Sequence, residues 1–238
     1  MGRFSRVIFG RDRLPSRCIV YGGAYGPGRK EAVRRLFDDW TRLKGNWIRY
    51  AFAVRNGKEY LMVFNVYGGA VTLEVLNVLK DGGTETVFFI GSMYAKRLPV
   101  GALVIPVLVT DYAGLVRVDT PRKVIVKPDG DSIDAVRSAL EASELPYEEA
   151  KVASVPCVLH DVARVRKLVA DGKDIAGVEM EVSTFYHFSR KLGLRGHALL
   201  YVSDNPMYGV ISGAKAVWRA RKESLQTATR VALKVLGS

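Results

Sequence analysis

Residues 177–206, GVEMEVSTFYHFSRKLGLRGHALLYVSDNP, contain the pattern that decides the fold. A strand-like run meets the start of a helix at Glu179-Met180-Glu181, and apolar residues then recur at helical spacing over residues 180–192. A short apolar run at residues 197–202 follows and stops at the turn Ser203-Asp204-Asn205-Pro206. A strand, an amphipathic helix and a second strand in succession are typical of an α/β protein.

The same alternation extends outward over the rest of the chain. Asn56-Gly57 between two apolar runs predicts a β-hairpin, and Pro106 predicts an edge or a bulge in its strand. We expect strands at residues 17–21, 48–54, 60–66, 87–90, 102–109, 123–126 and 147–155. We expect helices at residues 71–79, 132–142, 161–170 and 213–236, and helical spacing also covers residues 32–40. This alternation predicts an α/β sandwich around a largely buried sheet, and the lack of a linker predicts a single domain over residues 1–238.

The composition excludes several classes of protein. The chain has 238 residues, 48% of them hydrophobic, and a formal net charge of +12. This composition is too apolar for a disordered polyelectrolyte. Its two cysteines, Cys18 and Cys157, make neither a disulfide scaffold nor a CxxC zinc motif. There is no run of five or more like charges, no apolar run near the roughly 18 residues of a membrane span, and no signal peptide. We expect a cytoplasmic protein that binds neither nucleic acid nor a membrane.

Ligands of open α/β sheets bind at the carboxyl ends of the strands, so residues there are the first candidates. Four positions qualify: the glycine turn at residues 22–28, Gly68-Gly69, Gly91-Ser92 and Ser203-Asp204. The glycine turn before a helix either holds an anion on backbone N–H groups or is a plain turn, and Gly91-Ser92 is either a ligand contact or a tight strand exit. Arg29 favours an anion, because a cation in the first turn opposes the helix dipole.

The acidic residues leave two interpretations open. Glu179 and Glu181 at a helix start are good partners for the helix dipole and by themselves indicate no ligand. Asp204 either caps the turn at Asn205-Pro206 or is a partly buried acid that donates a proton. The histidines lack metal-ligand spacing, and the serines lack a nucleophile elbow. We therefore expect neither a metal site nor a Ser-His-Asp hydrolase.

Together these motifs resemble those of one family. GVEME at residues 177–181 opens a helix, and VSDN at residues 202–205 follows about twenty residues later at a strand end. The Gly68-Gly69 turn, FIGS at residues 89–92 and GALVI at residues 101–105 fall where that family has its own motifs. The chain resembles the nucleoside phosphorylase superfamily, which includes purine nucleoside phosphorylases, uridine phosphorylases and nucleosidases. The resemblance, from about Cys18 to the C-terminus, implies a single-domain α/β/α sandwich with a central mixed, partly barrel-like sheet flanked by helices.

The resemblance also implies roles for individual residues. Glu181 matches the glutamate that binds the 2′- and 3′-hydroxyls of the ribose, and Met180 packs against the sugar. Asp204 matches the acid that protonates the purine at N7 as the glycosidic bond breaks, and Arg221 matches an arginine that helps to position that step. The expected substrate-binding set is Glu181, Met180, Glu179 and Ser203.

The expected phosphate site departs from the family pattern. Inorganic phosphate is the expected co-substrate, with no other cofactor, and the matching positions are Arg29, Ser92 and Gly22. Phe89 stands where family phosphorylases usually carry an arginine, and charge-assisted arginine–phosphate hydrogen bonds are about twice as strong as neutral ones. The family also implies a homo-oligomer in which a neighbouring subunit lends an arginine; the candidates are Arg42 and Arg49.

We therefore expect a purine nucleoside phosphorylase, which releases the free base and ribose 1-phosphate. Two alternatives stay open. In a nucleosidase water replaces phosphate, which the missing arginine favours, and Glu31 becomes a candidate base that activates the water. In a nucleoside-binding protein on the same fold catalysis is lost, which Phe89 and the altered glycine turn favour.

Overall fold

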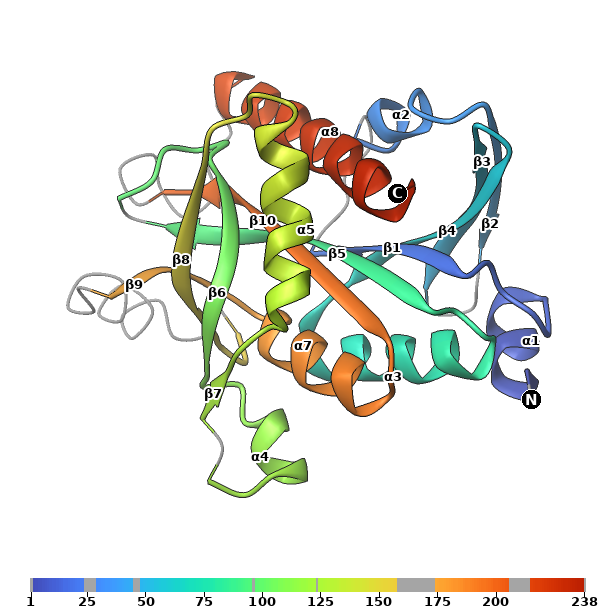
Figure 1. Ribbon diagram of the computed structural model, residues 1–238, viewed down its shortest axis with the longest axis horizontal. Helices are drawn as coiled ribbons and strands as arrows, with labels where there is room; N and C mark the ends of the chain where they lie inside the picture. Colours follow the sequence, from blue (N-terminus) through green and yellow to red (C-terminus); the bar gives the residue numbers. More distant parts are fainter. Residues whose placement is uncertain are drawn as a thin grey trace.

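The computed structural model describes residues 2–23, 29–44, 48–95, 97–122, 124–157, 174–205 and 215–237, without the side chains of residues 29, 30 and 42–44. Figure 1 shows a twisted sheet with helices on both sides. The strands are β1 (Arg17–Gly22), β2 (Asp39–Lys44), β3 (Arg49–Arg55), β4 (Lys58–Val66), β5 (Thr86–Ala95), β6 (Leu103–Asp111), β7 (Ile125–Val126), β8 (Tyr147–Ser154), β9 (Ile175–Glu179) and β10 (Arg195–Asp204). The helices are α1 (Arg3–Phe9), α2 (Arg29–Arg34), α3 (Gly68–Asp81), α4 (Leu115–Asp119), α5 (Gly130–Glu141), α7 (Val182–Lys191) and α8 (Lys215–Gly237).

The described strands form one ten-stranded sheet in the order β10-β6-β8-β9-β5-β1-β4-β3-β2, with β7 paired to β6. Strand β5 also pairs with β10, so β10, β6, β8, β9 and β5 close into a circle. Strands β4, β1, β5 and β10 are parallel to their neighbours in that series, whereas β9 is antiparallel to β5. These pairings confirm the predicted mixed, partly barrel-like sheet.

Side chains alternate across the central strands and produce a separate core on each face of the sheet. In β5, Val87 and Phe89 belong to the core that includes residues of α3 and α7, whereas Phe88 and Ile90 belong to the core that includes residues of α5 and α8. Helix α3 packs on α7, and α5 packs on α8. Figure 1 shows α3 and α7 along the lower side of the sheet and α8 and α2 along its upper side. The two helical layers confirm the predicted α/β/α sandwich.

Several local predictions are confirmed. Asn56 and Gly57 form the two-residue turn between β3 and β4, with φ values of 49° and 72°, the positive values that the favoured two-residue hairpin turn requires. Helix α3 covers the helix expected at residues 71–79 and extends it at both ends, to Gly68 and Asp81. Pro106 lies at a register shift between β6 and β8, where a bulge accommodates a residue without a backbone N–H donor.

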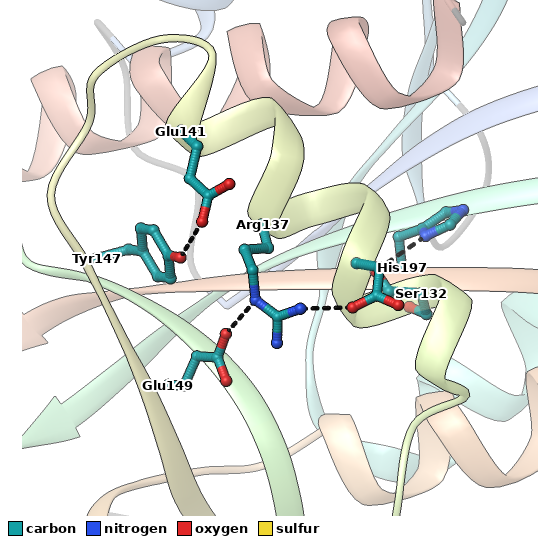
Figure 2. Close-up of polar contacts among 7 residues, drawn as sticks. Ser132, Arg137, Glu141, Tyr147, Glu149 and His197 are labelled. Carbon is teal, nitrogen blue, oxygen red and sulfur yellow. Dashed lines mark hydrogen bonds and ion pairs between the residues drawn. The ribbon is translucent and has the colours of Figure 1, made fainter.

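Polar contacts fasten helix α5 to strands β8 and β10, as Figure 2 shows. Arg137 Nε donates to Glu149 Oε1 on β8 at 2.7 Å. At the start of β10, His197 Nδ1 lies 3.5 Å from the carbonyl oxygen of Ser132 on α5. The contact to β10 is therefore near the start of the helix, and the contact to β8 is in its second half.

The helical conformation predicted by apolar spacing over residues 32–40 is wrong beyond Arg34. Helix α2 stops at Arg34, and Trp40 lies in β2, where it pairs with Ala53 of β3. The ring of Trp40 lies 5.4 Å from that of Phe37. Backbone pairing with β3 supplies hydrogen-bond partners that outweigh the helical spacing of the apolar residues.

The expected strand exit at Gly91-Ser92 is also wrong. Both residues lie inside β5, because β10 continues to pair with β5 as far as Tyr94. Helix α1 has no counterpart among the expected helices, and the helix expected at residues 161–170 lies outside the described residues. None of the helices in the described parts of the chain combines the length and the apolar character needed to cross a membrane.

Candidate active site

The candidate site lies at the carboxyl ends of the parallel strands β4, β1, β5 and β10. Gly22 pairs with Val66 at the ends of β1 and β4. The pairing of β1 with β5 stops just before Gly91-Ser92, so Ser92 lies beyond the edge that the two strands share. A Cβ atom on Gly23 would lie 2.9 Å from Ser92 Oγ. The start of the glycine turn and Ser92 therefore adjoin at one end of the sheet.

Glu181 directly precedes helix α7 and is 3% exposed. Its Oε1 accepts the N–H of Gly68 at 2.7 Å, and its Oε2 accepts the N–H of Met180 at 3.3 Å. Because Gly68 is the first residue of α3, the carboxylate lies at the positive end of that helix dipole. Burial, and then the charge of Glu179, raise the pKa of Glu181. Glu181 is therefore a buried acceptor whose remaining lone pairs suit hydroxyl donors.

Glu179 is the last residue of β9 and is 2% exposed. Its Oε2 accepts the N–H of Glu181 at 2.6 Å and that of Val182 at 2.7 Å. The carboxylate thus satisfies backbone donors at the start of α7 that have no partner within the helix. Its Oε1 also accepts the hydroxyl of Ser154, so three protein donors hold this carboxylate. It holds the turn that presents Glu181.

Asp204 ends β10, with its side chain 20% exposed, and Arg221 of α8 pairs with it from a position where its own side chain is 5% exposed. Arg221 Nη2 bonds to Asp204 Oδ1, and Arg221 Nε donates to the carbonyl oxygen of Ser203 at 2.6 Å. The Ser203 hydroxyl donates to Asp204 Oδ2 at 2.7 Å. One guanidinium therefore fixes both the backbone and the carboxylate of this strand end.

Tyr67 lies close enough to Glu181 and Asp204 for their charges to affect its phenol. Sequence reasoning missed this residue. It lies between β4 and α3, directly before Gly68, and is 50% exposed. Burial raises the pKa of Tyr67, and the negative charges of Glu181, Cys157 and Asp204 raise it further. At Tyr94, β5 pairs with the last residue of β10 on one side and with β9 on the other, so the carboxylates of Asp204 and Glu181 come from the elements on either side of β5. The signal available in the sequence was an aromatic residue before a glycine turn into a helix.

Met180 lies beside the same turn. Its Cε would be 3.9 Å from a Cβ atom on Gly68, whose φ of +81° favours glycine. Met180 and Glu181 therefore both lie next to the start of α3, and Glu181 accepts the N–H of Gly68.

Phe89 fills the space next to the end of β1. The ring is fully buried and packs on Phe185, with the ring centroids 5.2 Å apart. Its Cζ lies 2.4 Å from where a Cβ atom on Gly22 would stand. Only glycine at position 22 admits this ring, so Gly22 has a packing reason that the glycine-turn interpretation did not contain.

The other candidates have fewer described contacts. Arg29 begins α2, but its side chain, that of Arg42 and residues 24–28 of the glycine turn lie outside the description. Glu31 is exposed and pairs with Arg34 at 3.5 Å, and Arg49 is exposed at the start of β3. Within the described ranges, no group of three or more histidine, cysteine or acidic side chains is arranged to hold a metal ion.

Three solved structures with this fold are, by their names, enzymes that act on nucleosides. Uridine phosphorylase from Vibrio fischeri has a TM-score of 0.81 and 19% sequence identity, over 95% of this chain and 93% of that chain. Purine nucleoside phosphorylase from Toxoplasma gondii has a TM-score of 0.80 and 16% identity, over 95% and 92%. The 5′-methylthioadenosine/S-adenosyl homocysteine nucleosidase from Campylobacter jejuni has a TM-score of 0.71 and 15% identity, over 92% and 97%. The class of fold is therefore that of the nucleoside phosphorylases.

The sequence identifies the family. The family model of the Phosphorylase superfamily matches residues 65–237, and no curated protein matches the chain significantly. The chain belongs to the phosphorylase superfamily, an enzyme family, as its motifs predicted. The structural neighbours include both phosphorylases and a nucleosidase. Family membership is therefore compatible with either phosphate or water as the group that receives the sugar.

Proposed function

We propose that this protein cleaves the N-glycosidic bond of purine nucleosides. The observation that carries the proposal is the pair of buried or partly buried carboxylates, Glu181 and Asp204, on either side of the end of β5. Glu181 is held by N–H donors alone, and Asp204 is held by a buried guanidinium. An acceptor for sugar hydroxyls and an acid for the leaving base are the two groups that this reaction needs on the nucleoside.

In the proposed mechanism, Glu181 accepts hydrogen bonds from the 2′- and 3′-hydroxyls of the ribose, and Met180 packs against the sugar. As the bond from C1′ to the base breaks, the sugar becomes oxocarbenium-like, and the electron pair goes to the purine. Asp204 gives a proton to N7, which neutralises the leaving base. Arg221 and Ser203 keep Asp204 in place through the contacts described above.

We propose phosphate as the group that receives the sugar, so that the products are the free base and ribose 1-phosphate. A phosphate oxygen forms the new bond to C1′ on the face opposite the departing base. Gly23 adjoins Ser92 Oγ just beyond the end of β1, and Arg29 follows the glycine turn at the start of α2. Backbone N–H groups and a helix start suit an anion.

Hydrolysis is the second candidate, and one observation favours it. The Phe89 ring occupies the space beside Gly22 with carbon, where an arginine–phosphate contact would need a polar group. In this reaction water replaces phosphate and free ribose is released, with Glu31 as the candidate base.

The experiment follows release of the free base from inosine, adenosine and uridine, with and without phosphate. Phosphate-dependent release from the purine nucleosides supports the proposal, and release of free ribose without phosphate supports hydrolysis. Thermal stabilisation by nucleosides without turnover supports a binding protein that has lost catalysis. Release from uridine alone contradicts the purine assignment.

We also propose that the protein is a homo-oligomer with active sites near subunit contacts. Light scattering tests this directly. A monomer would contradict the expectation that Arg42 or Arg49 of one copy serves the phosphate site of another.

A further inference from the structure

Behind Glu181, three neighbouring strands end in polar residues. Asp111 is the last residue of β6, Ser154 the last of β8 and Glu179 the last of β9. The strands are parallel, and the register pairs Asp111 with Ser154 and Ser154 with Glu179. We call these three residues the carboxyl-end row. Their exposed fractions are 0%, 0% and 2%, so the row is shielded from bulk water.

Hydrogen bonds connect the carboxyl-end row to helix α7. Ser154 Oγ donates to Glu179 Oε1 and accepts the N–H of Ser183 at 2.9 Å. Ser183 Oγ donates to Asp111 Oδ1 at 2.8 Å. In both cases a hydroxyl donates to a carboxylate, which is a charge-assisted bond of the stronger kind when the carboxylate is ionised. The hydroxyls of Ser154 and Ser183 therefore connect the ends of three strands to the first turn of α7.

The row reaches Glu181 through the backbone. Glu179 Oε2 accepts the N–H of Glu181, while its Oε1 is held by Ser154. At the other end of the row, Asp111 Oδ2 has no hydrogen-bond partner among the described residues. Leaving a buried carboxylate oxygen without a partner is costly, and in a native protein such a group calls for an explanation.

We propose that Asp111, Ser154 and Ser183 are positioning residues that act through Glu179 to fix where Glu181 meets the sugar. This inference rests on the proposed sugar-binding role of Glu181. None of the three touches the substrate in the proposed mechanism. Their effect is to remove freedom from the turn that presents Glu181, so that the carboxylate is in place before the nucleoside arrives.

The row also acts on Glu181 through charge. Burial raises the pKa of both Glu179 and Glu181; the charge of Asp111 adds to the rise at Glu179, and the charge of Glu179 adds to the rise at Glu181. Two tyrosines are near these glutamates: Tyr67, before α3, is near Glu181, and Tyr186, on α7, is near Glu179. Burial raises the pKa of both phenols, so they stay neutral. The carboxyl-end row is therefore the charged neighbour of Glu181 in these contacts.

The first test compares serine variants. Ser154→Ala and Ser183→Ala each remove one donor to a buried carboxylate, and we expect each to raise KM for a purine nucleoside about tenfold, with a smaller loss in kcat. Ser154→Thr and Ser183→Thr keep the hydroxyl and should restore most of the affinity. The matched control is Ser189→Ala on the same helix, because the buried Ser189 hydroxyl has no hydrogen-bond partner among the described residues. Should Ser154→Ala fail to fold, Ser183→Ala decides the comparison.

The second test uses Glu179→Gln and the pH profile. Without the charge of Glu179 the pKa of Glu181 falls, so the acid limb of kcat/KM should move to lower pH. Carbon-13 titration of the glutamate carboxyls measures the same change without substrate. It therefore separates failure of this inference from failure of the proposed function. Ser154→Ala and Ser183→Ala variants that match Ser189→Ala in KM and in the Glu181 carboxyl resonance would overturn the inference, even in an active enzyme.

Discussion

At the scale of single residues, the proposed chemistry depends on the contact between Asp204 and Arg221. Asp204→Asn keeps the shape of the side chain and removes the acid. We expect at least a tenfold loss of kcat on inosine or adenosine, because a positioned proton donor contributes about 10²–10⁴ in rate. The measurement is the steady-state rate of base release under the conditions that support turnover of the unchanged protein.

The control for this variant is Asp134→Asn, which changes a carboxylate on the surface of α5, where it pairs with Arg137. We expect wild-type kcat for that variant. An Asp204→Asn protein as fast as the control would remove Asp204 from the mechanism.

Gly22 supplies a second residue-scale prediction, this time about stability. An added methyl group would lie 2.4 Å from Phe89 Cζ, so Gly22→Ala should destabilise the protein by about 1–3 kcal/mol through overpacking. Gly130→Ala is the matched control, because nothing lies within 4 Å of its added atom and its backbone is helical. That change should stabilise by about 0.4–1 kcal/mol. Urea unfolding measures both, and equal midpoints would contradict the described packing of Phe89.

At the scale of elements, the contact between β10 and α5 includes a half-buried histidine. Desolvation, and then the charge of Arg195, lower the pKa of His197, against the Ser132 carbonyl contact shown in Figure 2. A lowered pKa in the folded state means that the unfolded chain binds more protons below about pH 6.5, so stability rises with pH. The contribution of His197 is complete above that pH and is lost as pH falls through this window.

We therefore expect the free energy of unfolding to fall more between pH 7 and pH 5 in the wild type than in His197→Gln. Urea unfolding at each pH gives the two stability curves. The stability of the wild type relative to His197→Gln should be lower at pH 5 than at pH 7. Parallel curves would show that the contact between β10 and α5 does not depend on the protonation of His197.

At the scale of the whole molecule, we propose that the chain folds as the single domain that the sequence predicts. Trp40 lies on the edge strand β2, and Trp218 lies on α8. Tryptophan fluorescence therefore reports on both an edge strand and the last helix, while far-ultraviolet circular dichroism reports on all helices and strands. We expect coincident denaturant midpoints at one protein concentration. Two separate midpoints would divide the chain into two folding units.

The sequence predicted most of the elements and the family, but not the surroundings of the site. Glu181, Asp204 and Arg221 were found because they belong to motifs at strand ends and on the last helix. Tyr67 was missed because it belongs to no motif, and Glu181 and Asp204 come together only because strands far apart in the chain pair with β5. Trp40 was misassigned because pairing with β3, rather than local spacing, decides its conformation.

The sequence by itself determined the alternation of strands and helices, the glycine turns and the family motifs, because these depend on local spacing and on residue types. Only the tertiary structure decided that Asp111, Ser154 and Glu179 form one row, since strand register brings together residues that are 25 or more positions apart. It also decided that the Phe89 ring requires glycine at position 22. Register and close packing depend on the whole sheet, so no single stretch of the sequence contains them.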